Sequence, residues 1–252
     1  MAGHSKWANR KHRKFRADAQ KGKIFTKMAR ELTVAAREGG SDPEYNVRLR
    51  LAIQKAKEAN MPNQNIERAI QKGSGSLEAN AYQSAILEGY GPGGVAVLLE
   101  ALTDNRNRTV SEIRNTFAKY EGNLGEAGCV SWMFNRKGYL QVSSQELPLE
   151  EEELMSLAIE AGAEDFKEED NYYEIITNPE DFEEVKDALA HQRIPINRAE
   201  ITMLPHTIVP VSDTEDATKV VQLLEALEES EDVQNVYSNF DMPEELFAQV
   251  EG

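Results

Sequence analysis

The sequence contains only one cysteine, Cys129, among 252 residues. An internal disulfide and a zinc site built from cysteines are therefore excluded, and a single thiol is typical of a reducing compartment. Long apolar runs are also absent: the longest, at 95–99, ends at Glu100 and is far shorter than the ~18 residues of a membrane-spanning helix. The first thirty residues are basic and lack the apolar stretch of a secretory signal. We therefore expect a cytoplasmic protein with no membrane segment.

Charge is distributed very unevenly along the chain. The net charge is −16, yet residues 1–30 contain ten basic residues and one acidic residue, a net charge of +9. Residues 141–252 contain five basic and thirty acidic residues, a net charge of −25. A basic segment of this density is typical of a protein that binds a polyanion. The acidic part is then expected to face away from that polyanion or to contact a basic protein.

The N-terminal third has the periodicity of amphipathic helices. Apolar residues recur at steps of three or four up to Gly39-Gly40, which predicts the end of the first helix. The capping box Ser41-Asp42-Pro43-Glu44 predicts the start of a second helix, with Tyr45 at the front of its apolar stripe. A third helix is predicted over residues 66–73. Helices with such short connections form a small bundle.

The remainder predicts two small α+β units. Strands at 85–90 and 95–103 flank a glycine-rich turn, and the capping box at 109–112 predicts a helix. A strand at 129–134 and a turn at 135–138 are expected next. Residues 138–204 then alternate between strands and helices in an order that suits a ferredoxin-like sheet. The pieces after residue 206 are expected to complete the sheet that begins near residue 80, with 233–240 pairing against the 85–103 strands.

We therefore predict an α+β protein of three domains: an N-terminal three-helix bundle and two small α/β sandwich domains, the last ferredoxin-like and inserted in the middle one. The basic arm and helical bundle take residues 1–78. The discontinuous middle domain takes 79–135 with 206–252. The inserted acidic domain takes 136–205.

Residues 1–17 do not fit the bundle. In a helix, their basic side chains would point nearly all round the axis, so the segment cannot bury a face and is expected to order on contact with a partner. Basic side chains beside aromatic ones suit phosphate neutralisation combined with base stacking. A solvated tail is the alternative. The predicted nucleic-acid-binding residues are Lys6, Trp7, Arg10, Lys11, His12, Arg13, Lys14, Arg16, Lys21, Lys23 and Lys27.

The sequence offers little sign of catalysis. The histidines at 4, 12, 191 and 206 have no metal-ligand spacing, and no nucleophile–base arrangement stands out. The acids at 150–153 are more typical of a solvated helix start than of an acid–base pair. The Gly89-Tyr-Gly-Pro-Gly-Gly94 segment leads into a strand, which favours a hairpin turn over a phosphate loop. We predict no catalytic residue, metal site or cofactor.

One polar loop is a possible secondary contact. Residues 103–108 lie between a predicted strand and a helix and contain Arg106 and Arg108. A loop in this position could hold an anion or an RNA backbone. It could equally serve to cap the helix.

Long contiguous motifs resemble the YebC family. They include Gly-His-Ser-Lys-Trp at 3–7, Gly-Lys-Ile-Phe-Thr-Lys at 22–27, Ala-Asn-Met-Pro at 59–62 and Asn-Ile-Glu-Arg-Ala-Ile at 65–70. Further matching stretches lie at 29–31, 35–37, 39–43, 48–50, 88–94, 102–109, 122–125 and 233–237. The resemblance therefore covers essentially the whole chain. It departs at Val47, in place of a common proline, and at Asn63-Gln64, in place of a Lys-Asp pair.

The resemblance implies three domains, one inserted in another, and one of two functions. Family members are described as probable transcriptional regulators that bind DNA, or as translation factors that act at the ribosome on proline-rich nascent chains. Mitochondrial members carry an extension before the Gly-His-Ser-Lys-Trp motif, so a bacterial cytoplasmic protein is expected here.

The residues themselves favour structured RNA. No helix-turn-helix or other groove-reading motif is evident, and aromatic residues in a basic arm suit looped RNA better than duplex. We therefore predict a non-enzymatic nucleic-acid-binding regulator of gene expression, with ribosomal RNA favoured over DNA. The alternative is a protein–protein interaction module that works through its acidic C-terminal domains. We expect neither a membrane partner nor a cofactor.

Overall fold

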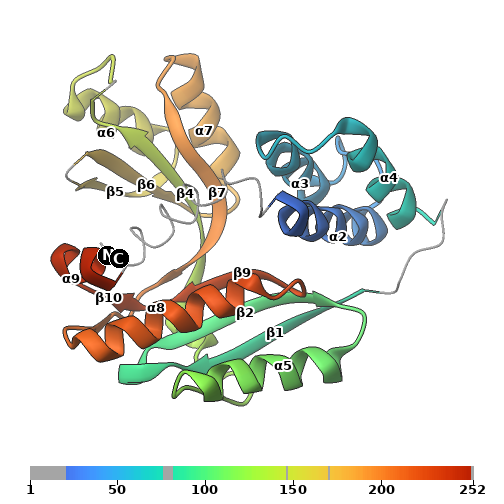
Figure 1. The fold of residues 1–252 in the computed structure, drawn as a ribbon. Coiled ribbons are helices and arrows are strands. Elements are labelled where there is room, and N and C mark those ends of the chain that lie inside the picture. Colours follow the sequence, from blue (N-terminus) through green and yellow to red (C-terminus); the bar gives the residue numbers. More distant parts are fainter. Residues whose placement is uncertain (1–20, 76–81, 146, 170, 251–252) are drawn as a thin grey trace. The chain divides into compact units, whose positions relative to one another are not determined.

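The structure, a computed structural model, describes residues 21–75, 82–145, 147–169 and 171–250. Its contacts divide the chain into two compact units. One comprises Met1–Met133 with Thr207–Gly252, and the other is the uninterrupted segment Phe134–His206. The chain is α+β, with an N-terminal helical region followed by two sheet-containing domains, which confirms the predicted fold class (Figure 1). The predicted boundaries at 78, 135 and 205 stay a prediction.

Three helices form the bundle of the first unit: α2 (Lys21–Gly39), α3 (Val47–Glu58) and α4 (Asn63–Gly73). α2 packs along both of the others. Leu32, Leu49 and Ile66, one from each helix, lie in the shared core. The amphipathic periodicity therefore predicted the bundle correctly, because each helix buries one stripe.

The start of α3 differs from the prediction. The capping box at 41–44 forms a turn, and Tyr45 is 87% exposed instead of lying in the apolar stripe. Asn46 caps the helix: its side-chain oxygen accepts from the Leu49 N–H at 3.0 Å. Its amide nitrogen donates to the carbonyls of Ala35 and Gly40, at 2.7 and 2.8 Å. The start of α3 is therefore set by the buried Asn46, which also bonds to α2, and not by the capping box at 41–44.

The middle sheet has the order β3-β1-β2-β9, and its neighbouring strands are antiparallel. The strands are β1 (Gln83–Tyr90), β2 (Ala96–Thr103), β3 (Asn123–Leu124) and β9 (Val233–Ser238). The pairing of β2 with β9 confirms that the C-terminal segment completes this sheet. The turn η2 (Pro92–Gly94) has positive φ at Gly93 and Gly94, 65° and 76°, which confirms the predicted glycine-dependent hairpin.

Helices α5 (Arg106–Lys119) and α8 (Thr214–Glu229) share one core with this sheet. Phe117 and Leu224 are fully buried there, together with Leu99 of β2. A two-stranded sheet of β8 (Val209–Pro210) and β10 (Phe240–Asp241) and the helix α9 (Glu244–Val250) complete the unit.

Two further predictions in this unit are wrong. α5 begins at Arg106 and is capped by Asn105, so the capping box at 109–112 lies inside the helix. The Thr109 hydroxyl is buried in a hydrogen-bond network and is not free to act as a cap. Residues 129–133 do not form a strand, because a bend and the short helix η3 (Ser131–Met133) occupy them, and only Phe134 of the predicted strand is extended.

The inserted unit is ferredoxin-like, with strands in the order β5-β6-β4-β7, all antiparallel. Helices α6 and α7 contribute Leu154 and Leu189 to its core. Its elements are β4 (Phe134–Ser143), α6 (Glu151–Glu160), β5 (Ala163–Glu169), β6 (Tyr172–Thr177), α7 (Phe182–His191) and β7 (Ile196–Pro205).

Two segments of this unit were predicted wrongly from the sequence. The turn predicted at 135–138 is part of β4, and Gly138 serves close packing: a Cβ there would lie 2.7 Å from the Phe182 ring. Strand β5 was missed because it is an edge strand in which exposed acidic side chains outnumber apolar ones.

Candidate nucleic-acid interface

The predicted nucleic-acid-binding residues fall into two groups. Lys6, Trp7, Arg10, Lys11, His12, Arg13, Lys14 and Arg16 lie outside the described residues. Lys21 is the first residue of α2, Lys23 is exposed on that helix, and Lys27 is half-buried. The structure therefore shows where the basic segment enters the bundle, at the N-terminal end of α2.

Two basic side chains of α2 are held by the segment that ends α8. The Lys27 amino group donates to the Glu228 carbonyl at 2.6 Å, near the C-terminus of α8. The Arg30 guanidinium donates to the Glu231 carbonyl at 2.6 Å. Helix C-termini favour cations, because their last carbonyls lack helical partners. Lys27 thus uses its charge within the molecule, whereas Lys23 remains exposed.

Asp232 is the centre of this contact. Its carboxylate is 4% exposed and accepts hydrogen bonds from Arg30 and Arg108, at 2.6 and 2.8 Å, and from Thr109 at 2.6 Å. Burial alone would raise the pKa of Asp232, but the Thr109 and Arg108 hydrogen bonds lower it below its usual range. Asp232 thereby joins α2, α5 and the start of β9.

The same network includes Arg108, one of the two arginines predicted as a secondary contact. Arg108 donates to both Asp232 and Asp104, and these hydrogen bonds raise its pKa further. Its guanidinium is therefore engaged in structure. Arg106 is exposed at the first turn of α5 and makes no hydrogen bond or ion pair with another described residue. The surroundings of these two arginines therefore differ, and a role for either in binding stays a prediction.

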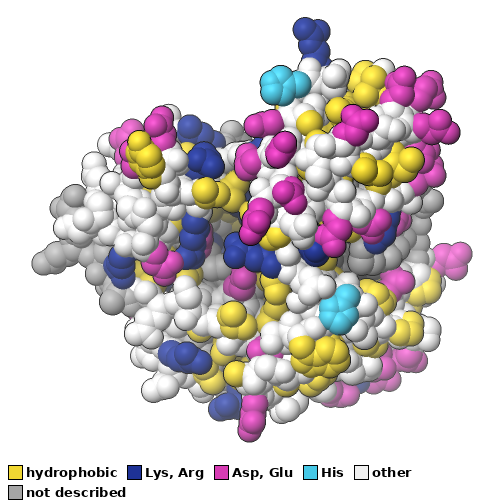
Figure 2. Space-filling model, turned by 180° about the vertical axis from the view of Figure 1, so that it is seen from behind, with side chains coloured by type: hydrophobic (Ala, Val, Ile, Leu, Met, Phe, Trp, Pro, Cys, Tyr) yellow, Lys and Arg dark blue, Asp and Glu magenta, His cyan; other side chains and the backbone are white. Residues whose placement is uncertain are grey.

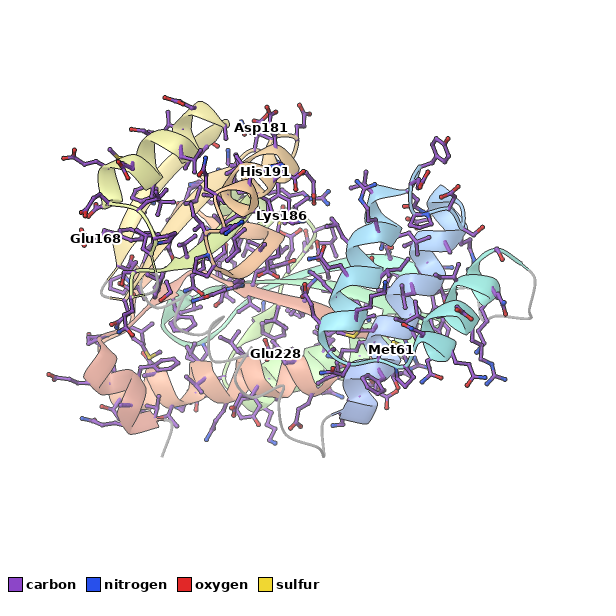
Figure 3. All side chains as sticks on the ribbon, turned by 90° about the horizontal axis from the view of Figure 1, so that it is seen from above. Met61, Glu168, Asp181, Lys186, His191 and Glu228 are labelled. Carbon is purple, nitrogen blue, oxygen red and sulfur yellow. The ribbon has the colours of Figure 1, made fainter. Side chains whose placement is uncertain are left out.

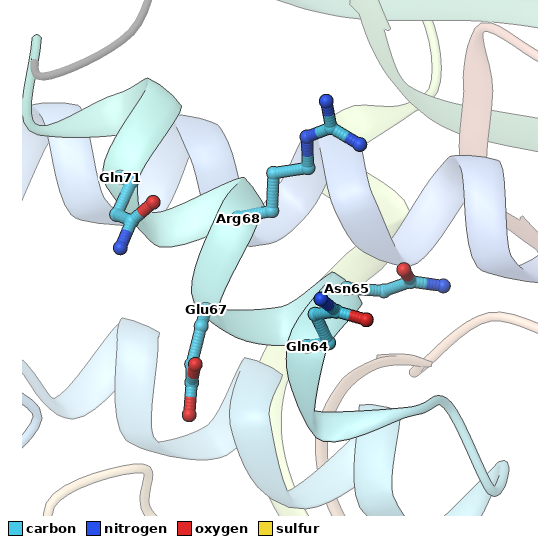
Figure 4. A pocket seen from close by; sticks show the side chains of 5 residues that line it. All are labelled: Gln64, Asn65, Glu67, Arg68 and Gln71. Carbon is cyan, nitrogen blue, oxygen red and sulfur yellow. The ribbon is translucent and has the colours of Figure 1, made fainter.

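Polar side chains gather on the solvent face of α4 (Figure 4). They surround an open hollow of about 490 Å³ lined by Gln64, Asn65, Glu67, Arg68 and Gln71. None of the five makes a side-chain hydrogen bond or ion pair with another described residue. Among the described residues, nothing engages these five side chains.

A second hollow, of about 430 Å³, lies between α2 and α4. It shares Asn65 and Arg68 with the first, and it adds the aromatic rings of Phe25 and Tyr82. The Arg30 guanidinium lies over the Tyr82 ring, 5.4 Å from its centre. Lys72 also lines this hollow, so cationic, amide and aromatic groups meet on one side of the bundle.

The polar surface of α4 was not predicted from the sequence. No groove-reading motif was evident, yet α3 and α4 are joined by a four-residue connection, 59–62, the turn length of a helix-turn-helix unit. Met61, in that connection, is buried in the bundle core (Figure 3). The signal in the sequence was the amide-rich run Asn63-Gln64-Asn65, with Arg68 and Gln71 on later turns.

No catalytic centre emerges from the part of the chain that the structure describes. Within it, no group of three or more His, Cys, Asp or Glu side chains is placed to hold a metal ion. The buried Glu88 carboxylate accepts three backbone N–H bonds, from Gly128, Val130 and Ser131, at 2.7–2.8 Å. It lines neither hollow, and its hydrogen bonds are those of a structural group.

The acidic side chains concentrate elsewhere. Figure 2 shows them gathered over the inserted unit, at the upper right of that view. Within it, α6 begins with Glu151, Glu152 and Glu153, all exposed. His191 lies at the end of α7, where its ring contacts the Asp187 carbonyl at 2.8 Å (Figure 3). None of the helices in the described ranges is long and apolar enough to cross a membrane.

These features define a modular α+β protein whose helical bundle carries a polar, cationic face. Comparison with known proteins assigns the family. Residues 5–76 match the TACO1/YebC protein N-terminal domain, and residues 82–240 match the TACO1/YebC second and third domain. The chain therefore belongs to the TACO1/YebC family, as its motifs predicted.

Close relatives extend over the whole chain. A protein of Natranaerobius thermophilus is 57% identical and one of Halothermothrix orenii 56% identical, each matching at least 98% of both chains. Both carry the name "Probable transcriptional regulatory protein". The crystal structure of a conserved hypothetical protein from Aquifex aeolicus is similar, with a TM-score of 0.79 and 54% identity over 90% of this chain and 93% of that one.

Proposed function

We propose that this protein is a non-enzymatic regulator of gene expression that binds nucleic acid through its basic N-terminal segment and the adjoining face of the helical bundle. The observation that carries the proposal is the net charge of +9 within residues 1–30 of a chain whose total is −16. This segment enters the bundle at α2, beside the hollow that contains Arg68 and Lys72. The names of the relatives support a regulatory role.

Ribosomal RNA is the favoured target, in a factor that assists translation of proline-rich sequences. Trp7 and His12 stand among the basic residues of the N-terminal segment, and Phe25 and Tyr82 line the hollow that follows it. Aromatic rings beside cations suit the splayed bases of looped RNA, on which they can stack. We place this role in the cytoplasm.

A transcriptional regulator that binds duplex DNA is the second candidate. Two observations favour it: the names of the relatives, and the α3–turn–α4 unit with amides and an arginine on its second helix. Asparagine, glutamine and arginine are the side chains that hydrogen-bond base edges in the major groove.

We assign a supporting role to the acidic inserted unit. Repulsion between its carboxylates and phosphates would keep nucleic acid on the bundle, or the unit would contact a basic protein. If the acidic surface is instead the main working surface, the chain is a protein–protein interaction module. In that case removal of the basic segment should leave partner binding intact.

Affinity measured over a salt series tests the proposal. The full-length protein and a variant lacking residues 1–20 are titrated with structured RNA and with duplex DNA. Because α2 begins at Lys21, the deletion leaves that helix in place. If about five basic residues contact phosphates of duplex DNA, log affinity should fall with log salt at a slope near −4.5, and the deletion should abolish most of that slope.

The two targets give different results. Tight RNA binding with weak, sequence-independent DNA binding supports the translation factor. Tight, sequence-dependent DNA binding that survives physiological salt supports the transcriptional regulator. Unchanged affinity for both nucleic acids after the deletion contradicts the proposal.

A further inference from the structure

We propose that helix α4 contacts bases: Arg68, flanked by Gln64 and Gln71, hydrogen-bonds the edges of unpaired RNA bases whose phosphates the N-terminal segment neutralises. This inference rests on the proposed function and names the part of the bundle that distinguishes one sequence from another. Its basis is the juxtaposition, around a single hollow, of amides and one guanidinium that have no side-chain partner among the residues the structure describes.

The spacing of these side chains suits base contact. Gln64, Arg68 and Gln71 follow one another at steps of four and three residues, so they lie in a row along one helix face. Amides pair with adenine through one donor and one acceptor, and arginine pairs with guanine through two donors. Glu67, beside the row, can accept from the amino group of cytosine. The row therefore offers both donors and acceptors, as base edges require.

A simple solvated helix face would look different. On the neighbouring α3, Arg48 pairs with Glu31 at 2.7 Å and also with Glu38, and Gln54 donates to Glu58 at 2.9 Å. The polar side chains that line the α4 hollow have no such partners among the described residues.

α4 is held rigidly enough to present this row. Ile66 and Ala69 are buried against α2, and the Thr33 hydroxyl of α2 donates to the Ala69 carbonyl at 3.1 Å. At Gly73 the two helices approach so closely that a Cβ would lie 2.3 Å from the Thr33 carbonyl oxygen. A fixed helix loses little conformational freedom on binding, which favours selective contacts.

The neighbouring hollow adds aromatic rings and a lysine, which the row of Gln64, Arg68 and Gln71 does not contain. Phe25 and Tyr82 offer rings for stacking, and Lys72 offers a charge for a phosphate. Phe25 lies about one helical turn after Lys21, where the basic segment enters. Because the two hollows share Asn65 and Arg68, one RNA strand can contact both of them.

The test uses full-length protein and a random-sequence pool of single-stranded RNA. Bound molecules are sequenced, and the preference for the enriched sequences over the starting pool is compared between wild type, Arg68→Ala and Gln64→Ala. Arg114→Ala is the matched control, because Arg114 is exposed on α5 and has no side-chain partner among the described residues. Alanine favours helix, so each variant should remain folded.

Arg68→Ala should lower the preference by roughly 5- to 150-fold, the value of one bidentate base contact. Its affinity for the unselected pool should change little and its salt slope should stay the same, because phosphate contacts set both. Gln64→Ala should act in the same direction, and Arg114→Ala should leave the preference unchanged.

The failures of the two proposals differ. If deletion of residues 1–20 reduces the salt slope but Arg68→Ala leaves the preference unaltered, the inference about α4 is overturned and the proposed function stands. A preference that depends on Arg68 in a random duplex DNA pool, and not in RNA, would overturn the RNA assignment. Absence of RNA and DNA binding by the intact protein would overturn both proposals.

Discussion

Asp232 links segments that lie far apart in the sequence. Its carboxylate contacts Arg30, about two hundred residues upstream, as well as Arg108 and Thr109 of α5. The Arg30 side chain is only 13% exposed, and its charge is compensated mainly by this buried carboxylate at 2.6 Å and also by the more exposed Glu231 carboxylate at 3.3 Å. The residue thus fixes α2 against the middle sheet, close to the place where the basic segment enters.

Replacement of this residue should destabilise the first unit. Asp232→Ala leaves the Arg30 and Arg108 charges without their shared partner, and we expect the free energy of unfolding to fall by about 1.5–3 kcal/mol. Urea unfolding measures the change. Asp104→Ala is the control, since this more exposed aspartate pairs with the same Arg108 and should change stability by less than ~1 kcal/mol. Equal effects of the two substitutions would contradict the role given to Asp232.

Glu88 gives a prediction for pH dependence. Burial alone would raise the pKa of Glu88, but the N–H groups of Gly128, Val130 and Ser131 hold it below its usual range. A carboxyl whose pKa is lower in the folded state stabilises the fold above the unfolded pKa, and this stabilisation is lost as pH falls through the folded pKa. Wild type should therefore lose stability on acidification.

Glu88→Gln should reduce the free energy of unfolding at neutral pH by ~1.5–3 kcal/mol, because three N–H groups lose an ionised acceptor. The difference from wild type should shrink as the pH is lowered to about 3, below the ordinary pKa of a glutamate. Urea titrations across this range test it, with Glu126→Gln, on the exposed side of the same loop, as control. A difference that stays constant with pH would show that the carboxylate charge is not involved.

Among the elements, the close approach of α2 and α4 makes the sharpest prediction. Gly73→Ala places a methyl group 2.3 Å from the Thr33 carbonyl oxygen, and the backbone must shift. We expect a loss of about 1–3 kcal/mol in stability, as for other overpacked sites. Gly22→Ala, also in a helix but with open space around it, should be neutral or stabilising by up to ~1 kcal/mol. Thermal unfolding of both variants distinguishes packing from helix propensity.

Elements with a strong local pattern were predictable from the sequence. The hairpin of β1 and β2 was found because apolar strands flank glycines that need positive φ. The start of α3 was not, because Asn46 caps it through a buried contact with α2 that no local pattern reveals. Gly138 was wrongly predicted to lie in a turn. A glycine is needed there because the Phe182 ring packs against it, and Phe182 lies more than forty residues away in the sequence.

The candidate site was predictable to a smaller extent. Charge counting identified residues 1–30, but it could not show that Lys27 donates to the α8 C-terminus or that Arg108 is engaged by Asp232. Those contacts join segments more than a hundred residues apart. The α4 row was not predicted for a different reason. Its amide side chains carry no charge, so counting charges along the sequence could not reveal them.

For the whole molecule, the inserted unit is a separable fold that carries an acidic charge of its own. The inserted unit has its own core and a complete βαββαβ order, and Phe134 pairs with Pro205, so its two ends are adjacent. Residues 134–206 contain eighteen acidic and six basic residues, a net charge of −12. Residues 134–206 can therefore be cut out as one continuous segment whose two ends lie next to each other.

The fragment Phe134–His206 should therefore fold alone, with a cooperative urea transition and a modest stability of about 3–5 kcal/mol at most. It should not bind RNA or DNA, because its field repels phosphates. Circular dichroism and a gel-shift titration measure the two properties. A fragment that unfolds without a cooperative transition would show that the surrounding unit is needed for its fold, and nucleic-acid binding by the fragment would contradict its assigned role.

We propose that the basic N-terminal segment brings this protein to RNA on the ribosome. The most direct test is cosedimentation with ribosomes of the full-length protein and of the variant lacking residues 1–20, at physiological salt. We predict that the full-length protein sediments with ribosomes and that the variant, folded as judged by its circular dichroism, stays in the supernatant. Equal association of the two proteins, or no association of either, would contradict the claim.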